Sequence, residues 1–483
     1  MNTNVMHIYP KSKHTLGDTE FYMMWDGLHN MLAVSGSLAL QFEGDDVSFD
    51  GKEVRLCPLT VENSKMIRQL FDFTNPKSHK GHNISFGLGD RLGLASVGHI
   101  QLVRELDVFP VLAQQSMREL NLTNRTYDDV LASAVWAVFR EGYTKGYGAD
   151  GDHLKTQDEV IYALECGYSM ITLDCSEHIR NDITDASKSK VDALYKGLPT
   201  ELTYSLESRY LNKSYQIDND VTIEFDETDF KRTVLVYYDA IIHAAGIYDE
   251  LIKGKSIDYE ISIDETLSVT SPQSHFFVAN ELITRGVEFS SLAPRFIGQF
   301  QKGIDYIGDI SDFKNDFIVH AKIAKKLGYR LSIHSGSDKF SVFPIIHEET
   351  DGKYHIKTAG TNWLEAVRVI AEQSPELYRE IHRFALEHLV EAKVYYQITE
   401  DVSKIADIEK VSDKDLSKYL DQDDARQVLH VTYGLLLTAT KDDGTSLFRD
   451  RIYDVLTKHE SDYIEALKKH IGKHLTALGI SLV

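Results

Sequence analysis

Short apolar runs alternate with longer helical patterns from about residue 83 to residue 360. Eight of these runs have the length and the β-branched or aromatic content of strands, and most are separated by segments with apolar residues at helical spacing. The predicted strands are Ile84–Leu88, Val108–Leu112, Gly146–Ala149, Ser169–Leu173, Tyr259–Ile263, Val287–Leu292, Arg330–Ile333 and His355–Thr358. Alternation of this kind indicates parallel β/α units, and eight units close a barrel. We therefore predict an α/β fold of the TIM-like (β/α)8 type.

The helices between these strands are clearest at three places. Tyr127–Lys145, Gln157–Cys166 and Asp312–Leu327 each carry the helical pattern. Gly328 directly follows the last of them and is the kind of residue that ends a helix.

Three regions depart from the barrel rhythm. In residues 1–80, short apolar runs at Leu38–Phe42 and Val54–Leu56 predict an N-terminal module with short antiparallel strands. Residues 175–258 form a long excursion after the fourth strand, with a helix at Thr233–Lys253, which we interpret as an insertion that caps the barrel. We expect three domains: residues 1–80, a barrel at 81–360 that includes the insertion, and an extension at 361–483.

The extension is helical throughout. Its predicted helices are Asn362–Glu372, Pro375–Lys393 and Tyr453–Leu478.

Composition narrows the possible partners. The formal net charge of −22 argues against a nucleic-acid partner, since a polyanion is repelled. The chain shows no apolar run long enough to cross a bilayer and no apolar signal segment at its start. Its three cysteines show neither CxxC spacing nor a paired framework, which fits a reducing compartment. We expect a cytoplasmic protein that acts on a small molecule, with a homo-oligomer as one possible assembly.

The predicted strands end in polar and ionisable residues. The stretch Tyr329–Gly336, YRLSIHSG, runs from apolar residues into His334, and GADGDHLK places His153 after the third strand. His275 follows the fifth strand. In a TIM barrel the carboxyl ends of all strands meet at one mouth. We therefore predict His153, His275 and His334 as ligands of a divalent cation such as Zn, Mn, Co or Ni, although a lone histidine is more often structural than a ligand.

Carboxylates and cations accompany these histidines. Asp152 and Glu265 are candidates for proton transfer, because they could face each other across a bound sugar. Asp174 is a further ligand or a partner that orients a histidine. The cations Lys155, Arg295, Lys339 and Lys357 are candidates for binding a substrate carboxylate, with surface exposure as the alternative for Lys339 and Lys357. The glycine-rich FGLGDRLGLAS lacks the spacing of a dinucleotide fingerprint, so we expect no nicotinamide.

Six long motifs carry a resemblance to a known family. They are FGLGDRLGLASVGH, GADGDHLKT, SIDETLSVTSPQSHFF, SLAPRFIGQFQKGIDYIGD, IHSGSDKFSVFPI and KTAGTNWLEAVR. These motifs resemble those of the tagaturonate epimerase family of bacterial hexuronate breakdown, and they span the whole predicted barrel. The resemblance implies interconversion of D-tagaturonate and D-fructuronate with a divalent metal. The residues singled out above lie inside these motifs. The resemblance therefore implies metal binding by His153, His275 and His334, and proton transfer by Asp152 and Glu265.

The chemistry of this reaction favours a retro-aldol route. The two keto-acids differ at a hydroxyl-bearing carbon β to the ketone, where the carbonyl does not acidify the C–H bond. Simple enolisation therefore cannot invert that carbon, whereas cleavage and re-addition of the carbon–carbon bond can. The alternatives are a metal-dependent aldolase or ketose isomerase acting on sugar acids, and a non-catalytic protein that binds a sugar acid on the same barrel.

Overall fold

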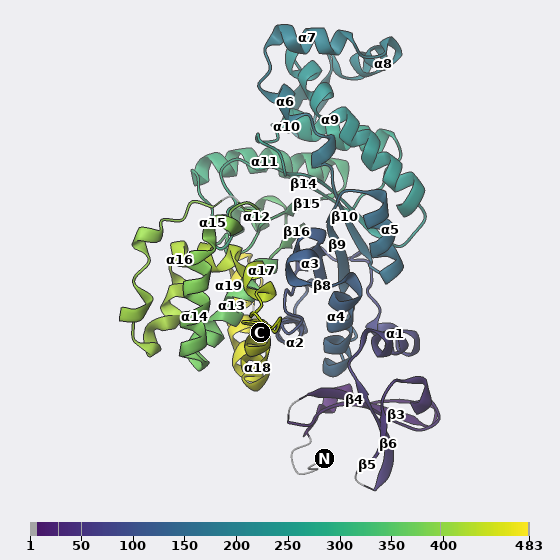
Figure 1. Ribbon diagram of the computed structural model, residues 1–483. Coiled ribbons are helices and arrows are strands. Elements are labelled where there is room, and N and C mark those ends of the chain that lie inside the picture. Colours follow the sequence, from purple (N-terminus) through teal and green to yellow (C-terminus); the bar gives the residue numbers. More distant parts are fainter. Residues whose placement is uncertain (1–6, 28, 50, 397, 482–483) are drawn as a thin grey trace.

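A closed barrel of eight parallel strands lies at the centre of this computed structural model, which describes residues 7–27, 29–49, 51–396 and 398–481 (Figure 1). The strands follow one another around the barrel in chain order. They are β7 (Ile84–Gly87), β8 (Phe109–Ser116), β9 (Gly148–Leu154), β10 (Met170–Asp174), β13 (Asp258–Ile263), β14 (Ser291–Pro294), β15 (Arg330–Ile333) and β16 (Tyr354–Lys357). The predicted fold class is confirmed.

Two strands continue beyond the apolar runs that predicted them. The prediction ended β9 at Ala149, but the strand runs on through Asp150 and Asp152 to Leu154. These carboxylates are buried in the barrel and paired with Lys357, so polar residues are tolerated where the pattern signalled a loop. β8 likewise continues through Gln114, which donates to Asp150. Hydrophobic periodicity misses strand ends of this kind.

Helices surround the barrel, and standard end signals set their limits. They are α2 (Ser96–Val103), α3 (Met117–Thr123), α4 (Tyr127–Glu141), α5 (Gln157–Cys166), α10 (Pro272–Thr284), α11 (Ile310–Leu327) and α12 (Phe343–Glu349). Thr126 and Asp129 form a capping box at the start of α4. Gly328 ends α11 in the left-handed conformation, as predicted.

An antiparallel sheet precedes the barrel. Its strands are β1 (His7–Ile8), β2 (His14–Leu16), β3 (Thr19–Trp25), β4 (Asn30–Ser35), β5 (Asp45–Phe49) and β6 (Lys52–Pro58), and α1 (Val61–Leu70) follows them. The predicted strand at Val54–Leu56 lies within β6. The one at Leu38–Phe42 is wrong, because Ala39–Gln41 forms a 3-10 turn in which Leu40 is 80% exposed. The first six residues of the predicted module lie outside the described residues.

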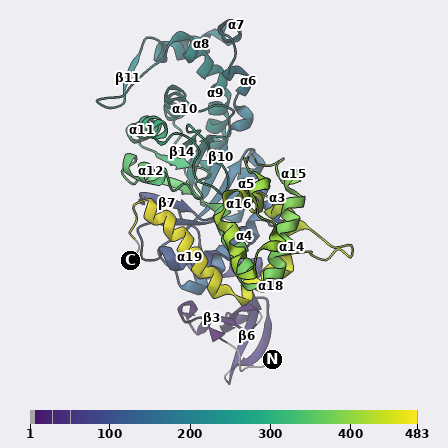
Figure 2. The ribbon, with the colours of Figure 1, turned by 90° about the vertical axis from the view of Figure 1, so that its left-hand side faces the viewer.

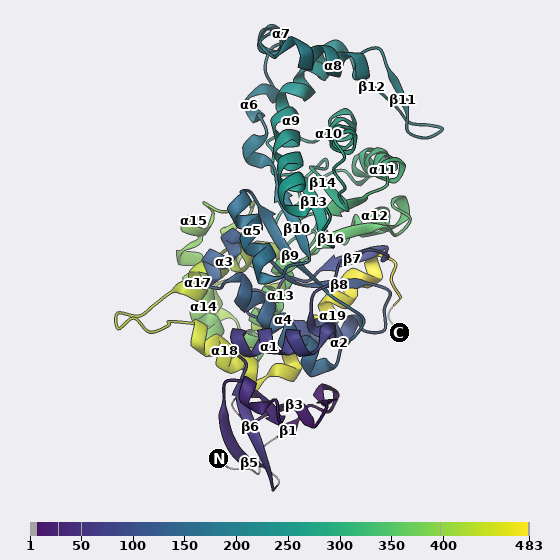
Figure 3. The same ribbon diagram turned by 90° about the vertical axis from the view of Figure 1, so that its right-hand side faces the viewer.

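The insertion after β10 forms an arm. It contains α6 (Asn181–Thr184), α7 (Lys188–Lys196), α8 (Thr200–Tyr210), the hairpin of β11 (Ser214–Gln216) and β12 (Thr222–Glu224), and α9 (Glu227–Ile247) with a π-helical end at Tyr248–Ile252. Figures 1 and 3 show α7, α8 and the hairpin far from the C-terminal helices. Only α9 returns along the barrel. The insertion is present as predicted, but its outer part projects away from the barrel.

The C-terminal segment is helical, as predicted. It contains α13 (Ala359–Gln373), α14 (Pro375–Glu387), α15 (Leu389–Ala392), α16 (Asp423–Val431), α17 (Tyr433–Thr438), α18 (Arg449–Lys458) and α19 (Glu460–Ala477), with 3-10 turns between Val402 and Asp421. Most of these helices share a separate apolar core around Trp363, Ile381 and Leu429. They form a second layer beside the barrel (Figure 1).

The last helix belongs to the barrel wall. Ile464, Ile471 and Leu475 of α19 are part of the main barrel core, and Figure 2 shows this helix crossing the flank of the molecule. It packs tightly on α2 at Gly98, where an added Cβ would lie 3.1 Å from Leu467. The division into three domains at residues 80 and 360 stays a prediction, since packing crosses the second boundary. Among the described helices, none is both long enough and apolar enough to span a membrane.

We expect Ile471→Ala to lower the free energy of unfolding of the whole barrel by about 2–5 kcal/mol, because Ile471 is fully buried and its removal leaves a cavity. Ile283→Ala is the matched control, since Ile283 is 40% exposed. Urea unfolding followed by tryptophan fluorescence and by circular dichroism measures both variants. A separate early transition confined to α19 would contradict the claim that this helix is part of the barrel wall.

Candidate active site

A cavity opens at the carboxyl ends of the barrel strands. Its walls come from residues at or just after β7, β8, β9, β13, β14, β15 and β16, and from Tyr396 and His430 of the C-terminal segment. No described residue of the insertion lines it, and only Asn181 reaches the adjoining outer cleft. The expectation that the insertion caps the barrel is therefore corrected: the C-terminal segment covers the mouth.

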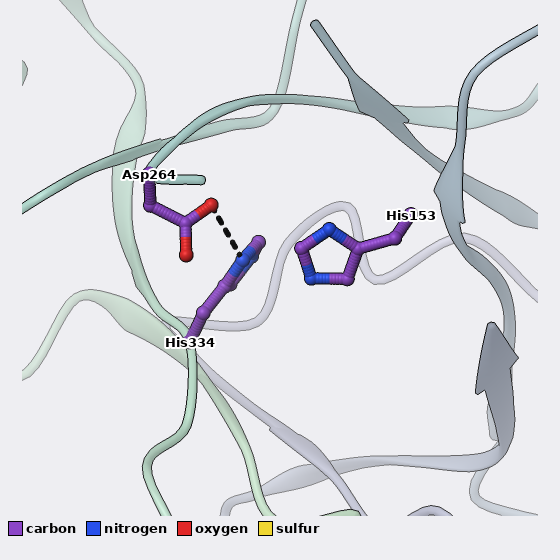
Figure 4. A group of neighbouring side chains, drawn as sticks. All are labelled: His153, Asp264 and His334. Atoms are coloured by element: carbon purple, nitrogen blue, oxygen red, sulfur yellow. Dashed lines mark ion pairs between the residues drawn. The ribbon is translucent and has the colours of Figure 1, made fainter. Parts of the chain in front are cut away.

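Two imidazoles and one carboxylate meet in this cavity. His153 on β9, Asp264 just after β13 and His334 just after β15 each offer a ligand atom, and these atoms lie within 4.8 Å of one another (Figure 4). His334 Nδ1 is 3.1 Å from Asp264 Oδ1, and the rings of His153 and His334 are 4.7 Å apart. Two histidines and a carboxylate form a donor set typical of Zn, Mn, Co or Ni sites.

The backbone is unusual at both histidines. His153 has a φ of 51°, and Ser335, next to His334, has the same value. The pairing of β9 with β10 also shifts register between Gly151 and Leu154, which is a bulge. Left-handed non-glycine residues cost free energy, and bulges at barrel rims redirect side chains toward active sites. The chain thus aims His153 into the cavity through a local irregularity.

His334 is held in the orientation of a metal ligand. Its Nε2 lies 2.8 Å from Glu260 Oε1 inside the barrel, and Ser291 Oγ donates to the other oxygen of that carboxylate at 2.5 Å. Its Nδ1 faces Asp264 and is buried without a hydrogen bond in proper geometry to any described residue. A carboxylate behind one ring nitrogen and an open second nitrogen is the arrangement that orients ligating histidines.

The carboxylates around His153 favour a positive charge at this point. Burial opposes protonation, but Asp152 and the other nearby carboxylates raise the pKa of His153 to about 10. Asp174 Oδ2 lies 3.8 Å from His153 Nδ1, and both atoms are buried without a hydrogen-bond partner among the described residues. Asp174, one of the predicted residues, therefore lies behind His153 rather than in the cavity wall. The donor set of His153, Asp264 and His334, together with the open Nδ1 of His334 that faces Asp264, fits a bound divalent cation.

The third predicted ligand, His275, is elsewhere. It lies on α10, fully buried, with Nδ1 2.8 Å from His320 Nδ1 and Nε2 2.6 Å from the hydroxyl of Tyr329. Both ring nitrogens are engaged, so neither is available to a metal. The structure thus brings two of the three predicted imidazoles together with Asp264 and leaves His275 outside this group. The motif spacing placed His275 near a strand end, but the residue already belongs to the following helix and faces α11.

Lys357 occupies the floor of the cavity. Its Nζ lies 2.6 Å from Asp152 Oδ1, 2.9 Å from Glu260 Oε1 and 3.1 Å from Asp150 Oδ2. Although burial opposes the charge, these carboxylates raise the pKa of Lys357 well above its usual range. Burial raises the pKa of Asp152, but Lys357 and the two cavity histidines outweigh it and hold that pKa well below its usual range. Lys357 therefore orients Asp152 and Glu260, and its donors are taken up by protein oxygens.

The other predicted residues are dispersed. Glu265 lines the cavity, and Arg295 lines the outer cleft, where it donates to the backbone oxygen of Thr266. Lys155 pairs with Asp174 at 3.7 Å, outside the cavity lining. Lys339 is fully buried and donates to three backbone oxygens, those of Gln301, Ile304 and Ser337, so it holds two loops together and has no contact with the cavity.

Sequence reasoning missed several residues of the cavity. Asp264 directly follows a predicted strand, and this position could have identified it as a candidate ligand. His275 was chosen as the ligand from this part of the chain instead. Arg91, Arg118 and Lys302 also line the cavity. Lys302 lies in the loop after β14, inside the motif SLAPRFIGQFQKGIDYIGD, but its spacing from the strand did not place it at the mouth of the barrel.

A second cluster of metal-binding residue types has a structural role. Asp338, His470 and His474 meet beside α19, but Asp338 also pairs with Arg426 at 2.7 Å. His470 Nε2 lies 2.5 Å from Asp338 Oδ1, and His474 Nε2 accepts from the Asp338 backbone N–H at 2.9 Å. A directly bound guanidinium opposes a cation at this point. This cluster fastens α19 to the loop after β15.

Comparisons with known proteins agree on one family. The family model described as tagaturonate epimerase matches residues 9–478. A tagaturonate/fructuronate epimerase of Thermotoga maritima is 40% identical over 480 residues, which are 98% of this chain and 96% of that protein. The native crystal structure of the fructuronate-tagaturonate epimerase of Cohnella laeviribosi has 49% identity and a TM-score of 0.96, covering 100% of this chain and 98% of that one. A glycerol complex of the same enzyme has the same identity and TM-score, covering 99% and 97%.

These matches extend over nearly the full length of each partner and include the strands and loops that build the cavity. The chain belongs to the tagaturonate epimerase family and is thus an epimerase, an enzyme of the isomerase class.

Proposed function

We propose that this protein interconverts D-tagaturonate and D-fructuronate with the help of a divalent cation held by His153, Asp264 and His334. The observation that carries the proposal is the convergence of these three side chains from separate strands at the mouth of a barrel of this family. A divalent cation in this position supplies Lewis acidity toward the ketone oxygen and the neighbouring hydroxyl of a bound keto-sugar.

The reaction has to invert one carbon without direct loss of its hydrogen. With the ketone at C2 and the carboxylate at C6, the two substrates differ at C4. A base removes the proton of the C4 hydroxyl, the C3–C4 bond breaks, and its electron pair stays with C3. The fragments are an enediolate of C1–C3 and an aldehyde of C4–C6. The aldehyde turns its other face to C3, the bond forms again, and an acid returns a proton to the C4 oxygen.

Asp152 and Glu265 supply these proton transfers. Both line the cavity that contains His153 and His334, so both are within reach of a substrate bound there. Asp152 is kept ionised and fixed in place by Lys357 at 2.6 Å, so its carboxylate carries no proton and has a set position when the substrate binds. Lys357 itself is held as an ammonium group, so it lacks the free amine needed for an imine route.

Removal of the bound metal should abolish activity, and Mn, Co, Ni or Zn should restore it. We expect His334→Gln to reduce the metal content of the purified protein to below about one tenth of the wild-type value, because a site that loses one of three ligands binds far more weakly. His275→Gln is the matched control and should keep its metal. Elemental analysis after dialysis measures both. Full activity in exhaustively chelated protein would refute the metal claim.

The inverted carbon should keep its original hydrogen during turnover in deuterated water. Cleavage between C3 and C4 leaves the C4–H bond intact, whereas a route through a carbanion at C4 exchanges that hydrogen with solvent. Proton NMR of the product, taken after several equilibrations, measures the deuterium at C4. Incorporation at C4 at the rate of epimerisation would rule out the retro-aldol route.

Asp152→Asn and Glu265→Gln should each lower kcat by about 10²- to 10⁴-fold, which is the usual contribution of a positioned acid or base. Metal content should stay near the wild-type value in both variants, because neither residue belongs to the proposed ligand set. A variant that keeps wild-type kcat would remove that residue from the proton-transfer scheme.

A further inference from the structure

A group of cations lines the same cavity as the two histidines. Arg91 comes from the loop after β7, Arg118 from α3, and Lys302 from the loop after β14. Glu119, the adjacent carboxylate on α3, also lines the cavity. The four residues come from two loops and one helix, yet they act on one another electrostatically. We call Arg91, Arg118 and Lys302 the cationic group.

Arg91 forms an ion pair with Glu119. Its Nε and Nη2 both donate to Glu119 Oε1, at 3.0 and 2.8 Å, and its guanidinium stacks on the ring of Tyr433 at 3.7 Å. The third nitrogen, Nη1, is buried and has no hydrogen-bond partner among the described residues. Arg91 is only 3% exposed. A buried guanidinium nitrogen without an acceptor is costly unless a ligand supplies one.

The other two cations have no carboxylate partner among the described residues. Lys302 Nζ makes one hydrogen bond, to Ser335 Oγ at 2.9 Å, and the described residues form no ion pair with it. Arg118 lies 5.1 Å from the ring of Tyr396 and has no ion pair with any described residue. Burial, and then the charge of Arg118, lower the pKa of Lys302. Like charges gathered at one place in a cavity raise the free energy of the empty protein, and a bound anion relieves that cost.

We propose that the cationic group binds the carboxylate of the substrate and thereby sets which hexose skeletons the enzyme accepts. This inference rests on the proposed function, which defines the substrate as a keto-acid. Arg118 and Lys302 line the same cavity and the charge of one acts on the other, and a guanidinium and an ammonium are both suited to a carboxylate. The sequence-based candidates fit less well, because Lys339 and Lys357 are engaged by protein oxygens, and Arg295 and Lys155 lie outside the cavity lining.

The position of the cationic group fixes the direction of the substrate. Lys302 is bonded to Ser335, the neighbour of His334, so the carboxylate site adjoins the proposed metal site. A six-carbon chain then places its ketone end at His153 and His334 and its carboxylate on Lys302 and Arg118. The carboxylate belongs to the C4–C6 fragment, which is the half that must turn between cleavage and re-addition. Anchoring its charged end keeps this fragment in the cavity during the turn.

The test compares three substrates on variants of the cationic group. Tagaturonate carries the carboxylate, tagatose has an uncharged CH2OH in its place, and tagatose 6-phosphate carries a different anion. We expect Lys302→Met and Arg118→Met each to lower kcat/KM for tagaturonate by about 10- to 150-fold, the value of a hydrogen bond to a charged group. The value for tagatose should change less than about threefold. Lys302→Arg should recover part of the loss, and Lys326→Met, on an exposed position of α11, is the control.

Thermal unfolding separates this role from a structural one. Lys302→Met removes a cation from a repulsive group, so its melting temperature should equal or exceed that of the wild type. An equal loss on tagaturonate and tagatose, or a lower melting temperature with unchanged discrimination, would overturn the proposal. A wild-type preference for tagatose 6-phosphate over tagaturonate would also overturn it. Wild-type protein that epimerises neither tagaturonate nor fructuronate would instead count against the proposed function itself.

Discussion

The buried charge balance around Lys357 is the constraint on which the site depends. A barrel interior is normally filled with apolar side chains, but here Asp150, Asp152 and Glu260 point into it from two strands. Burial raises the pKa of all three carboxyl groups; nearby cations reverse this shift at Asp152 and Glu260, whereas the pKa of Asp150 stays raised. Lys357 supplies one of these cations from a third strand. It thereby fixes Asp152 at the cavity floor and Glu260 behind His334, so the geometry of the rim follows from an ion cluster one layer below it.

The cavity above this cluster has two regions of opposite electrostatic preference. His153, Asp264 and His334 sit among carboxylates that favour an added positive charge, whereas Arg91, Arg118 and Lys302 favour an added negative one. A keto-acid has groups of matching kinds, since its ketone and hydroxyl oxygens suit a cation and its carboxylate suits the arginine and lysine side chains. In the proposed reaction this polarity serves a second purpose. The two fragments of a cleaved sugar remain bound at opposite kinds of site, and only the bond between them is lost and remade.

The sequence was a good guide to the fold and a partial guide to the site. All eight barrel strands lie at or within a few residues of their predicted places, because each is an apolar run bounded by helical patterns. The ends of β8 and β9 were missed, since their polar residues face a buried ion cluster that no periodicity reveals. His153 and His334 meet as expected, whereas His275 had already entered a helix. Tyr396 and Lys302 reach the mouth from loops and His430 reaches it from α16, and only tertiary packing determines these placements.

The proposed function requires one divalent cation between strands that are far apart in sequence, and anomalous diffraction tests this placement most directly. Crystals grown with Mn or Zn would be measured on both sides of the absorption edge of the metal. We predict a single strong peak bounded by His153, Asp264 and His334, in a cavity that Asp338, His470 and His474 do not share. A peak at that second cluster with none at the first, or no peak in crystals of fully active enzyme, would contradict the account.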